Sequence, residues 1–247
     1  MPASQAPTAL ITGAARNLGL AFVRHYAGQG WQVIATCRDP ASATELATLA
    51  RDSGGRVRVE ALDVGDEASV GALAARLGGS PIDLLVNNAA IPGSGLRQPF
   101  GETDYAEWAD IFRTNTMGPM LVSERLAANV VASGRKTILN ISSRIGPNAG
   151  YGVVAYRTSK TALNQITRQV AYALKDRGVI CIAMHPGWVQ NHRTTGTAAW
   201  TPDQSVQALA AVVDRLTPAD SGKFFDPDGS ELPLITQQLD PKPYGMA

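Results

Sequence analysis

Residues 9–19 read ALITGAARNLG, a short apolar run that leads directly into a turn with two glycines. Apolar residues at helical spacing begin inside this turn and predict a helix from Leu18 to Gln29. Glycines at a strand-to-helix turn let backbone N–H groups approach a pyrophosphate, and the helix N-terminus adds a field that favours anions. An ordinary strand-to-helix turn can also contain glycines, but this one lies where the dinucleotide-binding fingerprint requires them. The stretch therefore predicts a nucleotide-binding α/β domain.

The same alternation of apolar runs and amphipathic segments continues along the chain. We expect strands at about residues 9–11, 33–36, 57–62, 82–86, 137–141, 179–184 and 223–225, and helices at 18–29, 41–51, 67–77, 103–131, 156–177 and 202–216. Nearly continuous β-branched and leucine runs between helices indicate strands that are buried on both faces. The predicted fold is α/β, a Rossmann-type doubly wound sheet of seven mostly parallel strands with helices on both faces, in three αβα layers. No repeat or linker divides the chain, so residues 1–247 are expected to form a single domain with short tails.

Composition and charge argue against several classes of protein. With 22 basic and 21 acidic residues the formal net charge is +1, so neither nucleic acid nor an anionic membrane is expected as a partner. No apolar run approaches the roughly 18 residues that cross a bilayer, and residues 1–8 lack the features of a signal peptide, which predicts a soluble cytoplasmic protein. Cys37 and Cys181 fit buried free thiols. The three histidines show no ligand spacing, so no protein-bound metal is expected.

A second candidate feature lies in the predicted helix that begins near Tyr156. Tyr156 and Lys160 are four positions apart, so both side chains would lie on one helix face, with the ammonium near the phenol. Tyrosine and lysine at this spacing are common on helices, and the pair alone does not define a catalytic site. Ser143 follows a predicted strand thirteen positions before Tyr156. A strand-terminal cap is the alternative role for Ser142 and Ser143.

The end of the second predicted strand bears on the choice of dinucleotide. The fingerprint usually has an acidic residue there for the ribose 2′-OH, whereas this chain has Cys37 followed by Arg38. Arg16 adds a second cation inside the glycine turn. Because guanidinium groups pair with phosphate in a planar, bidentate way, the two arginines predict a 2′-phosphate site and a preference for NADP(H), with NAD(H) still possible. The alternatives are that Asp39 reaches the ribose, or that both arginines are solvated.

The motifs occur in the order found in the short-chain dehydrogenase/reductase family, which the chain resembles over nearly its whole length. They are TGAARNLG at 12–19, Asp63-Val64, NNAA at 87–90, Asn115, Ser143, Tyr156-x-x-x-Lys160 and Pro186-Gly187. The segments YRTSKTALN, HPGWVQ and DSGKFFDPDGSELP are most similar to the branch with C-factor-like and carbonyl-reductase-like members. Three positions depart from the family pattern: Asn17 and Ala90 replace glycines, and Asn191 replaces a threonine that contacts the nicotinamide amide. Asparagine tolerates the left-handed backbone, so the turn at residue 17 is expected to survive.

The resemblance implies a role for each residue of the site. Tyr156 would protonate the substrate oxygen, Ser143 would hydrogen-bond it, and Lys160 would bind the nicotinamide ribose and lower the tyrosine pKa. Asn115 would support the lysine through a water. A tyrosine pKa of about 10 that falls by ~3 units corresponds to roughly 4 kcal/mol, much of which one close ammonium can supply. The residues implied at the cofactor are Gly13, Arg16, Asn17, Leu18, Gly19, Arg38, Asp63 and Val64 (both at the adenine), Asn88, Ala89, Tyr156, Lys160, Pro186, Gly187 and Val189.

Loops at the carboxyl edge of the predicted sheet are expected to form the substrate site, with Asn87 lining the groove. The candidate substrate residues are Arg144, Tyr151, Trp188 and Asn191. Trp188, Tyr151 and Val153 would give an apolar wall, whereas Arg144, Asn148, His192 and Arg193 would suit an anionic or polar substrate. Residues of about 188–201 are a candidate lid over cofactor and substrate. His185 is expected to be a strand-end packing residue rather than an acid.

Together these features predict an NADPH-dependent reductase that transfers a hydride to a ketone or aldehyde, with a tyrosine as general acid. Alcohol oxidation or reduction of an imine or enone would use the same site. A dinucleotide-binding signalling or regulatory protein is the alternative from another class. The partner is expected to be a small-molecule carbonyl or alcohol substrate. The resemblance also implies a homodimer or homotetramer through the helices at 103–131 and 156–177.

Overall fold

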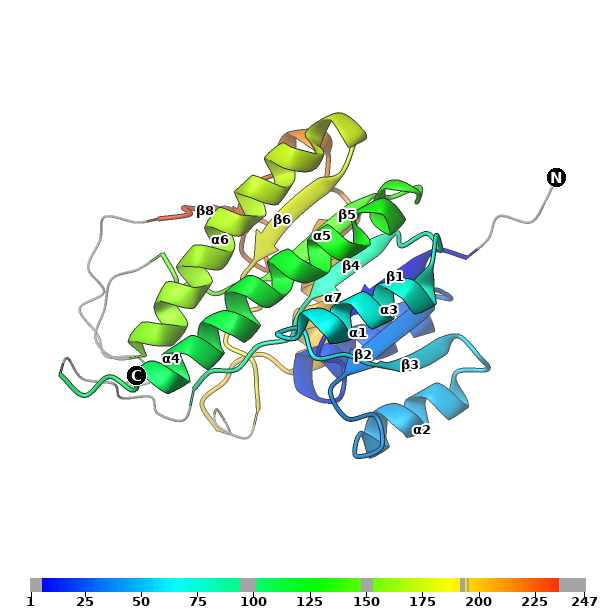
Figure 1. The fold of residues 1–247 in the computed structure, drawn as a ribbon, viewed down its shortest axis with the longest axis horizontal. Coiled ribbons are helices and arrows are strands. Elements are labelled where there is room, and N and C mark those ends of the chain that lie inside the picture. Colours follow the sequence, from blue (N-terminus) through cyan, green and yellow to red (C-terminus); the bar gives the residue numbers. More distant parts are fainter. Residues whose placement is uncertain (1–5, 94–100, 148–152, 192–193, 195, 236–247) are drawn as a thin grey trace.

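A computed structural model describes residues 6–93, 101–147, 153–191, 194 and 196–235 of the chain. The strands are β1 (Thr8–Ile11), β2 (Gln32–Cys37), β3 (Val57–Ala61), β4 (Leu84–Asn87), β5 (Thr137–Ile141), β6 (Ile180–Met184), β7 (Phe224–Phe225) and β8 (Glu231–Leu232) (Figure 1). The helices are α1 (Asn17–Gly28), α2 (Thr44–Asp52), α3 (Glu67–Leu77), α4 (Tyr105–Phe112), α5 (Gly118–Val131), α6 (Val154–Leu174) and α7 (Pro202–Val213). Each predicted strand and helix is present, with boundaries that shift by a few residues.

The described strands form one sheet in the order β3-β2-β1-β4-β5-β6-β7-β8. Pairing is parallel from β3 to β7, and β8 pairs antiparallel with β7. The chain reverses its direction of winding at β1, which lies between β2 and β4. Because parallel strands end at the same edge, the segments after β1, β4, β5 and β6 become neighbours there, where open α/β sheets bind ligands.

The eighth strand corrects the predicted count of seven. β8 spans only Glu231–Leu232 and pairs through Phe224↔Leu232 and Phe225↔Glu231. The turn that returns the chain is closed by the Asp226 N–H donating to Ser230 O at 2.9 Å, with Gly229 at a φ of 84°. Two residues are too few to show the alternation that identifies a strand in a sequence.

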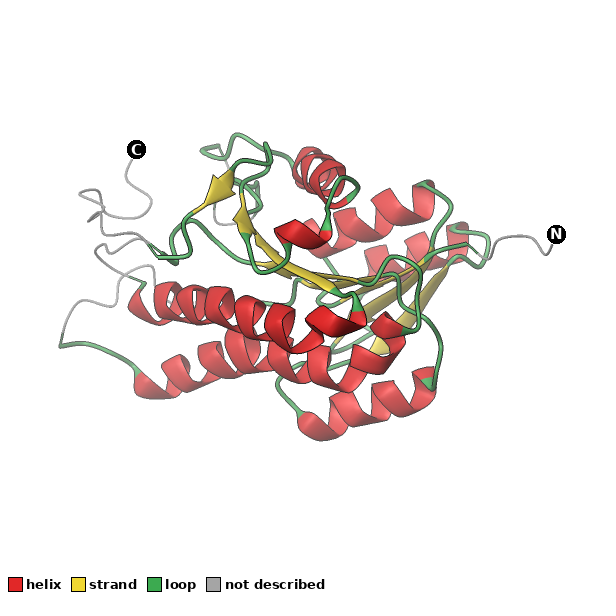
Figure 2. Cartoon of the chain, turned by 90° about the horizontal axis from the view of Figure 1, so that it is seen from above, coloured by secondary structure: helices red, strands yellow, loops and turns green. Residues whose placement is uncertain are grey.

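Helices cover both faces of the sheet, as Figure 2 shows from above. One core lies between the sheet and α1, α2 and α7, and includes Phe22, Leu46 and Val206. The other lies between the sheet and α3, α5 and α6, and includes Leu73, Leu126 and Val170. The doubly wound, three-layer prediction is therefore confirmed.

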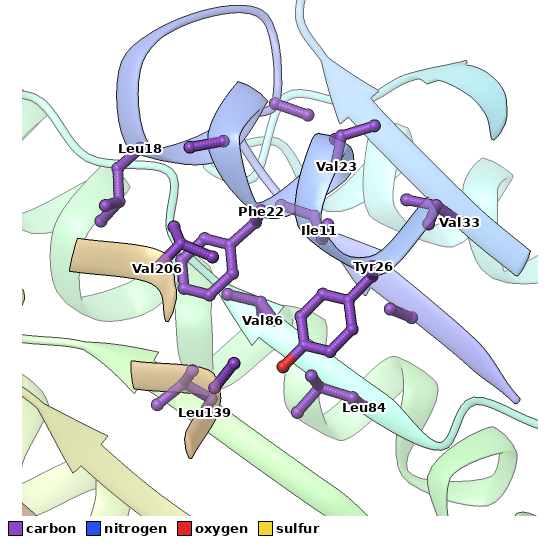
Figure 3. Close-up of a cluster of buried hydrophobic side chains, with 14 of the residues drawn as sticks. Ile11, Leu18, Phe22, Val23, Tyr26, Val33, Leu84, Val86, Leu139 and Val206 are labelled. Carbon is purple, nitrogen blue, oxygen red and sulfur yellow. The ribbon is translucent and has the colours of Figure 1, made fainter. Parts of the chain in front are cut away.

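Helix α1 is held over the start of the nucleotide-binding unit by its apolar face. Figure 3 shows Phe22 and Tyr26 of α1 lying over Ile11 and Val86 of the central strands, with Val206 of α7 beside them. A fully buried Phe side chain such as Phe22 contributes roughly 1.5–3 kcal/mol relative to exposure. This packing fixes the direction of α1 and thereby the turn that precedes it.

The predicted helix at 103–131 is interrupted. Asp104 caps α4 by accepting from the Ala106 and Glu107 N–H groups, and a π-helical turn at Arg113–Met117 joins α4 to α5. Turns of this kind insert one residue into the helical hydrogen-bond register and occur frequently at functional sites. Asn115, a predicted site residue, lies in the middle of it.

Among the described residues, no helix is both long and apolar enough to span a bilayer. Within those same ranges, no group of three or more His, Cys, Asp or Glu side chains is placed to hold a metal ion. Cys37 and Cys181 are buried free thiols, as the sequence predicts.

Candidate active site

The turn between β1 and α1 requires its two glycines. Gly13 has a φ of 67°, and a Cβ at this position would lie 2.8 Å from the Cα of Ala89. A Cβ on Gly19 would lie 2.2 Å from the carbonyl oxygen of Gly13. Asn17 has a φ of 49°, the left-handed conformation that the sequence predicts for it. The turn is thus packed against itself and against the residues that follow β4.

The N-terminus of α1 is left open to an anion. Its N-cap residue, Arg16, makes no side-chain cap hydrogen bond, and the first turn holds no acidic residue. The backbone N–H groups at this end and the helix dipole can therefore act on a phosphate. The Leu18 side chain lies in the core with Phe22, so Leu18 can meet a cofactor only through its backbone.

Thr12 and Asn88 fasten this turn to β4. The Thr12 hydroxyl accepts from the Asn88 and Ala89 N–H groups, each at 3.0 Å. The Asn88 amide nitrogen donates to the carbonyl oxygens of Thr12 at 2.9 Å and Gly13 at 3.2 Å. Asn88 and Ala89 therefore shape the turn itself. Thr12 was not among the predicted site residues, although a hydroxyl at the last position before the first glycine was a signal for it.

Arg16 and Arg38 are both exposed at this end of the sheet. Within the described part of the chain, neither side chain takes part in an ion pair or a hydrogen bond. Asp39, by contrast, accepts from the Ala41 N–H at 3.1 Å, in a local turn. The two guanidinium groups are available to an anion, and one carboxylate oxygen of Asp39 is used in its own turn.

The predicted adenine site follows β3. Asp63 is exposed, and its Oδ1 accepts from the Gly65 N–H at 2.9 Å. Its second carboxylate oxygen has no partner among the described residues, so it can accept from a ligand amine. Val64 is buried against Gly118, where an added Cβ would lie 2.9 Å from Val64 Cγ2.

Helix α6 brings Tyr156 and Lys160 together on one face, as their spacing predicts. The Lys160 Nζ lies 5.6 Å from the centroid of the Tyr156 ring and donates to the Ile141 carbonyl oxygen at 2.8 Å. The lysine is 2% exposed, and this burial lowers its pKa to about 7. Within the described ranges the Lys160 ammonium has one carbonyl partner, so it gains from a ligand that offers further oxygen acceptors.

Asn115 braces the loop after β4 against α6. Its amide donates to the Ile91 carbonyl oxygen and accepts from the Ile91 N–H, both at 2.8 Å. It also donates to the Ser159 hydroxyl at 3.2 Å, one residue before Lys160. Both amide N–H groups are used in this way. The water-mediated link to Lys160 stays a prediction.

The two serines after β5 have different surroundings. Ser142 is 2% exposed, and its hydroxyl lies 2.6 Å from Asn164 Oδ1 and 3.4 Å from the Lys160 carbonyl oxygen. Ser143 is partly exposed, and its hydroxyl accepts from the Ile145 N–H at 3.3 Å. Ser142 therefore joins β5 to α6, while Ser143 remains the candidate for contact with a substrate.

A buried chain of polar side chains lies beneath these residues. The Asn87 amide donates to Asn140 Oδ1 at 2.8 Å and to the Ser123 hydroxyl at 3.1 Å, and Asn140 donates to the Thr167 hydroxyl at 2.9 Å. Asn87 is 2% exposed, which corrects the expectation that it lines the groove. Asn140, Asn164 and Thr167 were not predicted, although an asparagine inside the apolar strand TILNI was a signal for a buried partner.

The candidate lid is anchored at both of its ends. Val189 and Trp200 form a bridge, in which the Gln190 N–H donates to the Trp200 carbonyl oxygen at 2.8 Å. Gly187 has a φ of 84°, and a Cβ there would lie 3.3 Å from Trp200 Cδ1. The Trp200 N–H donates to the Trp188 carbonyl oxygen at 3.2 Å. The segment therefore leaves and rejoins the domain at one point, next to Pro186-Gly187.

Asn191 is held inside this segment by its neighbours. Its N–H donates to the Thr194 hydroxyl at 2.8 Å, and that hydroxyl donates to the Val189 carbonyl oxygen at 2.8 Å. The Asn191 amide also donates to Val189 O, at 3.3 Å. Thr194 was not predicted. It supplies a hydroxyl three residues after the position where the family usually has its threonine.

The predicted substrate residues are only partly described. Tyr151, Asn148, His192 and Arg193 lie outside the described residues. Arg144 forms a two-point ion pair with Asp226, which any anionic substrate would have to share. His185 continues β6, and its N–H donates to the Phe225 carbonyl oxygen at 2.8 Å. Burial, with a smaller effect from Arg144, lowers the pKa of His185 to about 4, so it is neutral at physiological pH, as a packing residue would be.

Comparison with known proteins identifies the family. Residues 7–203 match the model of the short chain dehydrogenases. The C-signal protein of Myxococcus xanthus is 36% identical over 156 residues, which cover 62% of this chain and 93% of that protein. The NADPH-bound carbonyl reductase from chicken fatty liver has a TM-score of 0.83 at 32% identity, covering 93% of this chain and 99% of that one. A short-chain dehydrogenase/reductase from Burkholderia multivorans with bound NADP has a TM-score of 0.82 at 32% identity, covering 92% and 98%.

These similarities extend over the turn after β1, the Tyr156–Lys160 face of α6 and most of the sheet. They confirm the resemblance drawn from the sequence, including its carbonyl-reductase-like relatives. The chain belongs to the short-chain dehydrogenase/reductase family of NAD(P)-dependent oxidoreductases.

Proposed function

We propose that this protein is an NADPH-dependent reductase that delivers a hydride to the carbonyl carbon of a ketone or aldehyde. The observation that carries the proposal is the Tyr156–Lys160 arrangement, in which a buried ammonium lies 5.6 Å from the tyrosine ring at the ligand-binding edge of the sheet. A protein that only senses a dinucleotide has no need of an acid at this position. The arrangement therefore favours chemistry over signalling.

The residues present fit a phosphorylated dinucleotide. The uncapped start of α1 would hold the pyrophosphate, and Asp63 would accept from the adenine amine. Arg16 and Arg38 are exposed and unpaired within the described residues, whereas Asp39 uses one carboxylate oxygen in its own turn. A 2′-phosphate would receive charge-assisted hydrogen bonds from the two guanidinium groups. The chicken carbonyl reductase and the Burkholderia protein, solved with NADPH and NADP, support the same choice.

The protein would supply the proton and the orientation for the reaction. A bound NADPH provides the hydride. Tyr156 would hold the proton that the substrate oxygen receives, and Ser143 would donate a hydrogen bond that keeps this oxygen in place. Lys160 would favour the tyrosinate that remains, because an ammonium close to a phenol stabilises its charged form. The same residues can run alcohol oxidation, or reduce an imine or enone.

The decisive experiment measures turnover of a carbonyl panel, with benzaldehyde, hexanal, acetophenone and menadione, using NADPH and NADH separately. We expect NADPH-dependent reduction of at least one member, and a loss of at least about a thousandfold in Tyr156→Phe, since the variant has no acid. NADPH affinity should stay within about threefold. Tyr172→Phe is the matched control, because Tyr172 lies on the same helix and is 84% exposed.

Two outcomes would contradict the proposal. Substantial reduction by Tyr156→Phe would remove the tyrosine from the chemistry. Binding of NADPH with no turnover of any carbonyl, imine, enone or alcohol would favour the regulatory alternative. Equal or better use of NADH would overturn the cofactor preference alone, and it would leave the reductase assignment in place.

The homodimer or homotetramer through α5 and α6 remains a prediction. Several apolar residues of these helices, such as Met120, Leu121 and Ile166, are only partly buried, and the exposed positions include Glu124, Arg125, Arg168 and Gln169. Tyr172 is an apolar exception. An interface on this face would combine apolar and polar contacts, and light scattering at several concentrations would show whether it forms.

A further inference from the structure

Three neighbouring strand ends bring together groups that the proposed chemistry does not use. Met184 of β6 pairs with Ile141 of β5 on one side and with Phe225 of β7 on the other. The pairing continues past the strands, because the Ser142 N–H donates to Met184 O and the His185 N–H donates to Phe225 O, both at 2.8 Å. The segment that begins at Ser142 and the residue after Phe225 therefore reach the same edge of the sheet.

Arg144 and Asp226 join these strand ends by a two-point ion pair between guanidinium and carboxylate, the Arg144–Asp226 fork. The Arg144 Nε lies 2.8 Å from Asp226 Oδ1, and Nη2 contacts Oδ2. The Asp226 side chain is only 12% exposed, whereas that of Arg144 is 55% exposed. Parallel N–H···O contacts from a planar guanidinium fix orientation as well as distance, which a lysine does not do. The carboxylate is thus a rigid anchor for the residue directly after Ser143.

The rest of the Ser143 turn is fastened on its other side, to α6. The Gly146 N–H donates to the Ser143 carbonyl oxygen at 3.0 Å, and the Ile145 N–H donates to the Ser143 hydroxyl at 3.3 Å. A Cβ on Gly146 would lie 3.0 Å from the Lys160 carbonyl carbon, so this end of the turn lies against the helix backbone. Among the described residues, the Arg144–Asp226 pair is the hydrogen-bonded link between this turn and the segment after β7.

We propose that Asp226 is a positioning residue of this active site, which acts through Arg144 to hold the Ser143 turn against the strand edge. The proposal rests on the proposed function for the role of Ser143, although the hold on the turn can be measured without it. Removing the carboxylate would leave the turn fastened to α6 and, through the preceding Ser142 N–H, to β6. The Ser143 hydroxyl would then sample positions away from the substrate oxygen, which lowers turnover more than it lowers substrate binding.

The fork also predicts a dependence on pH. Burial raises the pKa of the Asp226 carboxyl, as does Asp228, while Arg144 acts in the opposite direction. As pH falls through this raised value, Asp226 takes up a proton and the charged fork is lost. The groups around it are Arg144 on the β5 side, His185 after β6, and Asp228 with Arg215 behind it. His185 gains charge only near pH 4 and would then repel Arg144, so both groups weaken the fork in acid.

The test compares Asp226→Asn, Arg144→Met and the double variant with Asp203→Asn, which breaks the surface pair between Asp203 of α7 and Arg24 of α1. Hydrogen exchange of the 143–146 amides is the first measurement. Exchange should become about tenfold faster than in wild type in both single variants. In the double variant it should be no faster than in either single variant. Exchange in β6 should be unchanged, and thermal melts should show all four variants folded. The control should match wild type throughout.

Kinetics are the second measurement, with the carbonyl that wild type reduces best. We expect kcat to fall about tenfold in each single variant with KM nearly constant. In wild type, kcat should begin to fall at a pH above about 4, which is the pKa of an ordinary aspartate. This acid limb should be absent from both single variants. Unchanged exchange, or effects that add in the double variant, would overturn the positioning role. If wild type reduces no carbonyl, the proposed function fails, and hydrogen exchange alone decides the role of Asp226.

Discussion

The cofactor side and the substrate side of the strand edge are held in different ways. After β1, the turn is fixed by contacts that involve backbone atoms, with Gly13 against Ala89 and Thr12 bonded to two N–H groups. After β5, the turn is fixed by side chains, through the Arg144–Asp226 fork and the Ser142–Asn164 contact. Backbone contacts tolerate few substitutions, whereas side-chain contacts can be exchanged.

The largest effect should come from Lys160, which lies where the two sides meet. Lys160→Met should lower turnover at least about a thousandfold, because the tyrosine loses its neighbouring charge and the cofactor loses an ammonium. Steady-state kinetics with NADPH measure the loss, and Lys175→Met, at an exposed position just beyond α6, is the control. Turnover within tenfold of wild type would separate Lys160 from the chemistry.

The next effect concerns the choice of dinucleotide on the cofactor side. Replacing both Arg16 and Arg38 with Ala should lower kcat/KM for NADPH about a hundredfold, or roughly 2.7 kcal/mol, since two charge-assisted contacts to the 2′-phosphate are lost. The value for NADH should change less than about threefold. Arg24→Ala is the control, because Arg24 lies on α1 and is paired with Asp203. An equal loss for both cofactors would argue that these arginines do not discriminate between them.

A smaller effect is expected on stability, and it tests the rigidity of the backbone contacts in the turn after β1. Gly13→Ala should destabilise the protein by about 2 kcal/mol, because the residue has a positive φ and its Cβ would meet Ala89 at 2.8 Å. Urea unfolding measures the change. Gly71→Ala is the matched control, since Gly71 lies inside α3 with no atom within 4 Å of an added Cβ, and it should gain up to about 1 kcal/mol. Equal stabilities of the two variants would show that the turn can relax.

The last effect is a pH dependence of stability that arises from Lys160. Its folded pKa is lowered to about 7, below the unfolded value of about 10.4, so the unfolded state holds more protons between these limits. The unfolding free energy contributed by this group therefore rises with pH through that window and is lowest below about pH 7. Wild type should gain at least about 1 kcal/mol on Lys160→Met between pH 7 and 9.5 in urea titrations. A constant difference would indicate that the lysine is solvated.

Much of this architecture could be predicted from local pattern alone. The strands were visible as apolar runs, and the left-handed Asn17 and the shared face of Tyr156 and Lys160 followed from residue type and spacing. β8 was missed because a two-residue strand shows no alternation. The π-helical turn around Asn115 was missed because a change in hydrogen-bond register leaves the pattern of apolar residues almost unchanged.

Contacts between distant segments were the part that one sequence could not provide. Arg144 and Asp226 are 82 positions apart, and no periodic signal connects them. The inward direction of Asn87 was nearer to being predictable, because alternation along β4 places it on the same face as Leu85, which packs below the sheet against α5. For the same reason Asn140 shares the face of Ile138. Reading that alternation to the last residue of each strand would have separated core asparagines from those at the groove.

If the dinucleotide binds at Lys160 as proposed, the buried state of this lysine would make binding a proton-linked event. Near pH 8 the unliganded lysine is mostly neutral, because its pKa is about 7. A ribose whose hydroxyls accept from the ammonium raises that pKa, so the protein takes up part of a proton from the buffer as the cofactor binds. The heat of binding will therefore depend on the ionisation enthalpy of the buffer, and affinity will weaken as the solution becomes more alkaline.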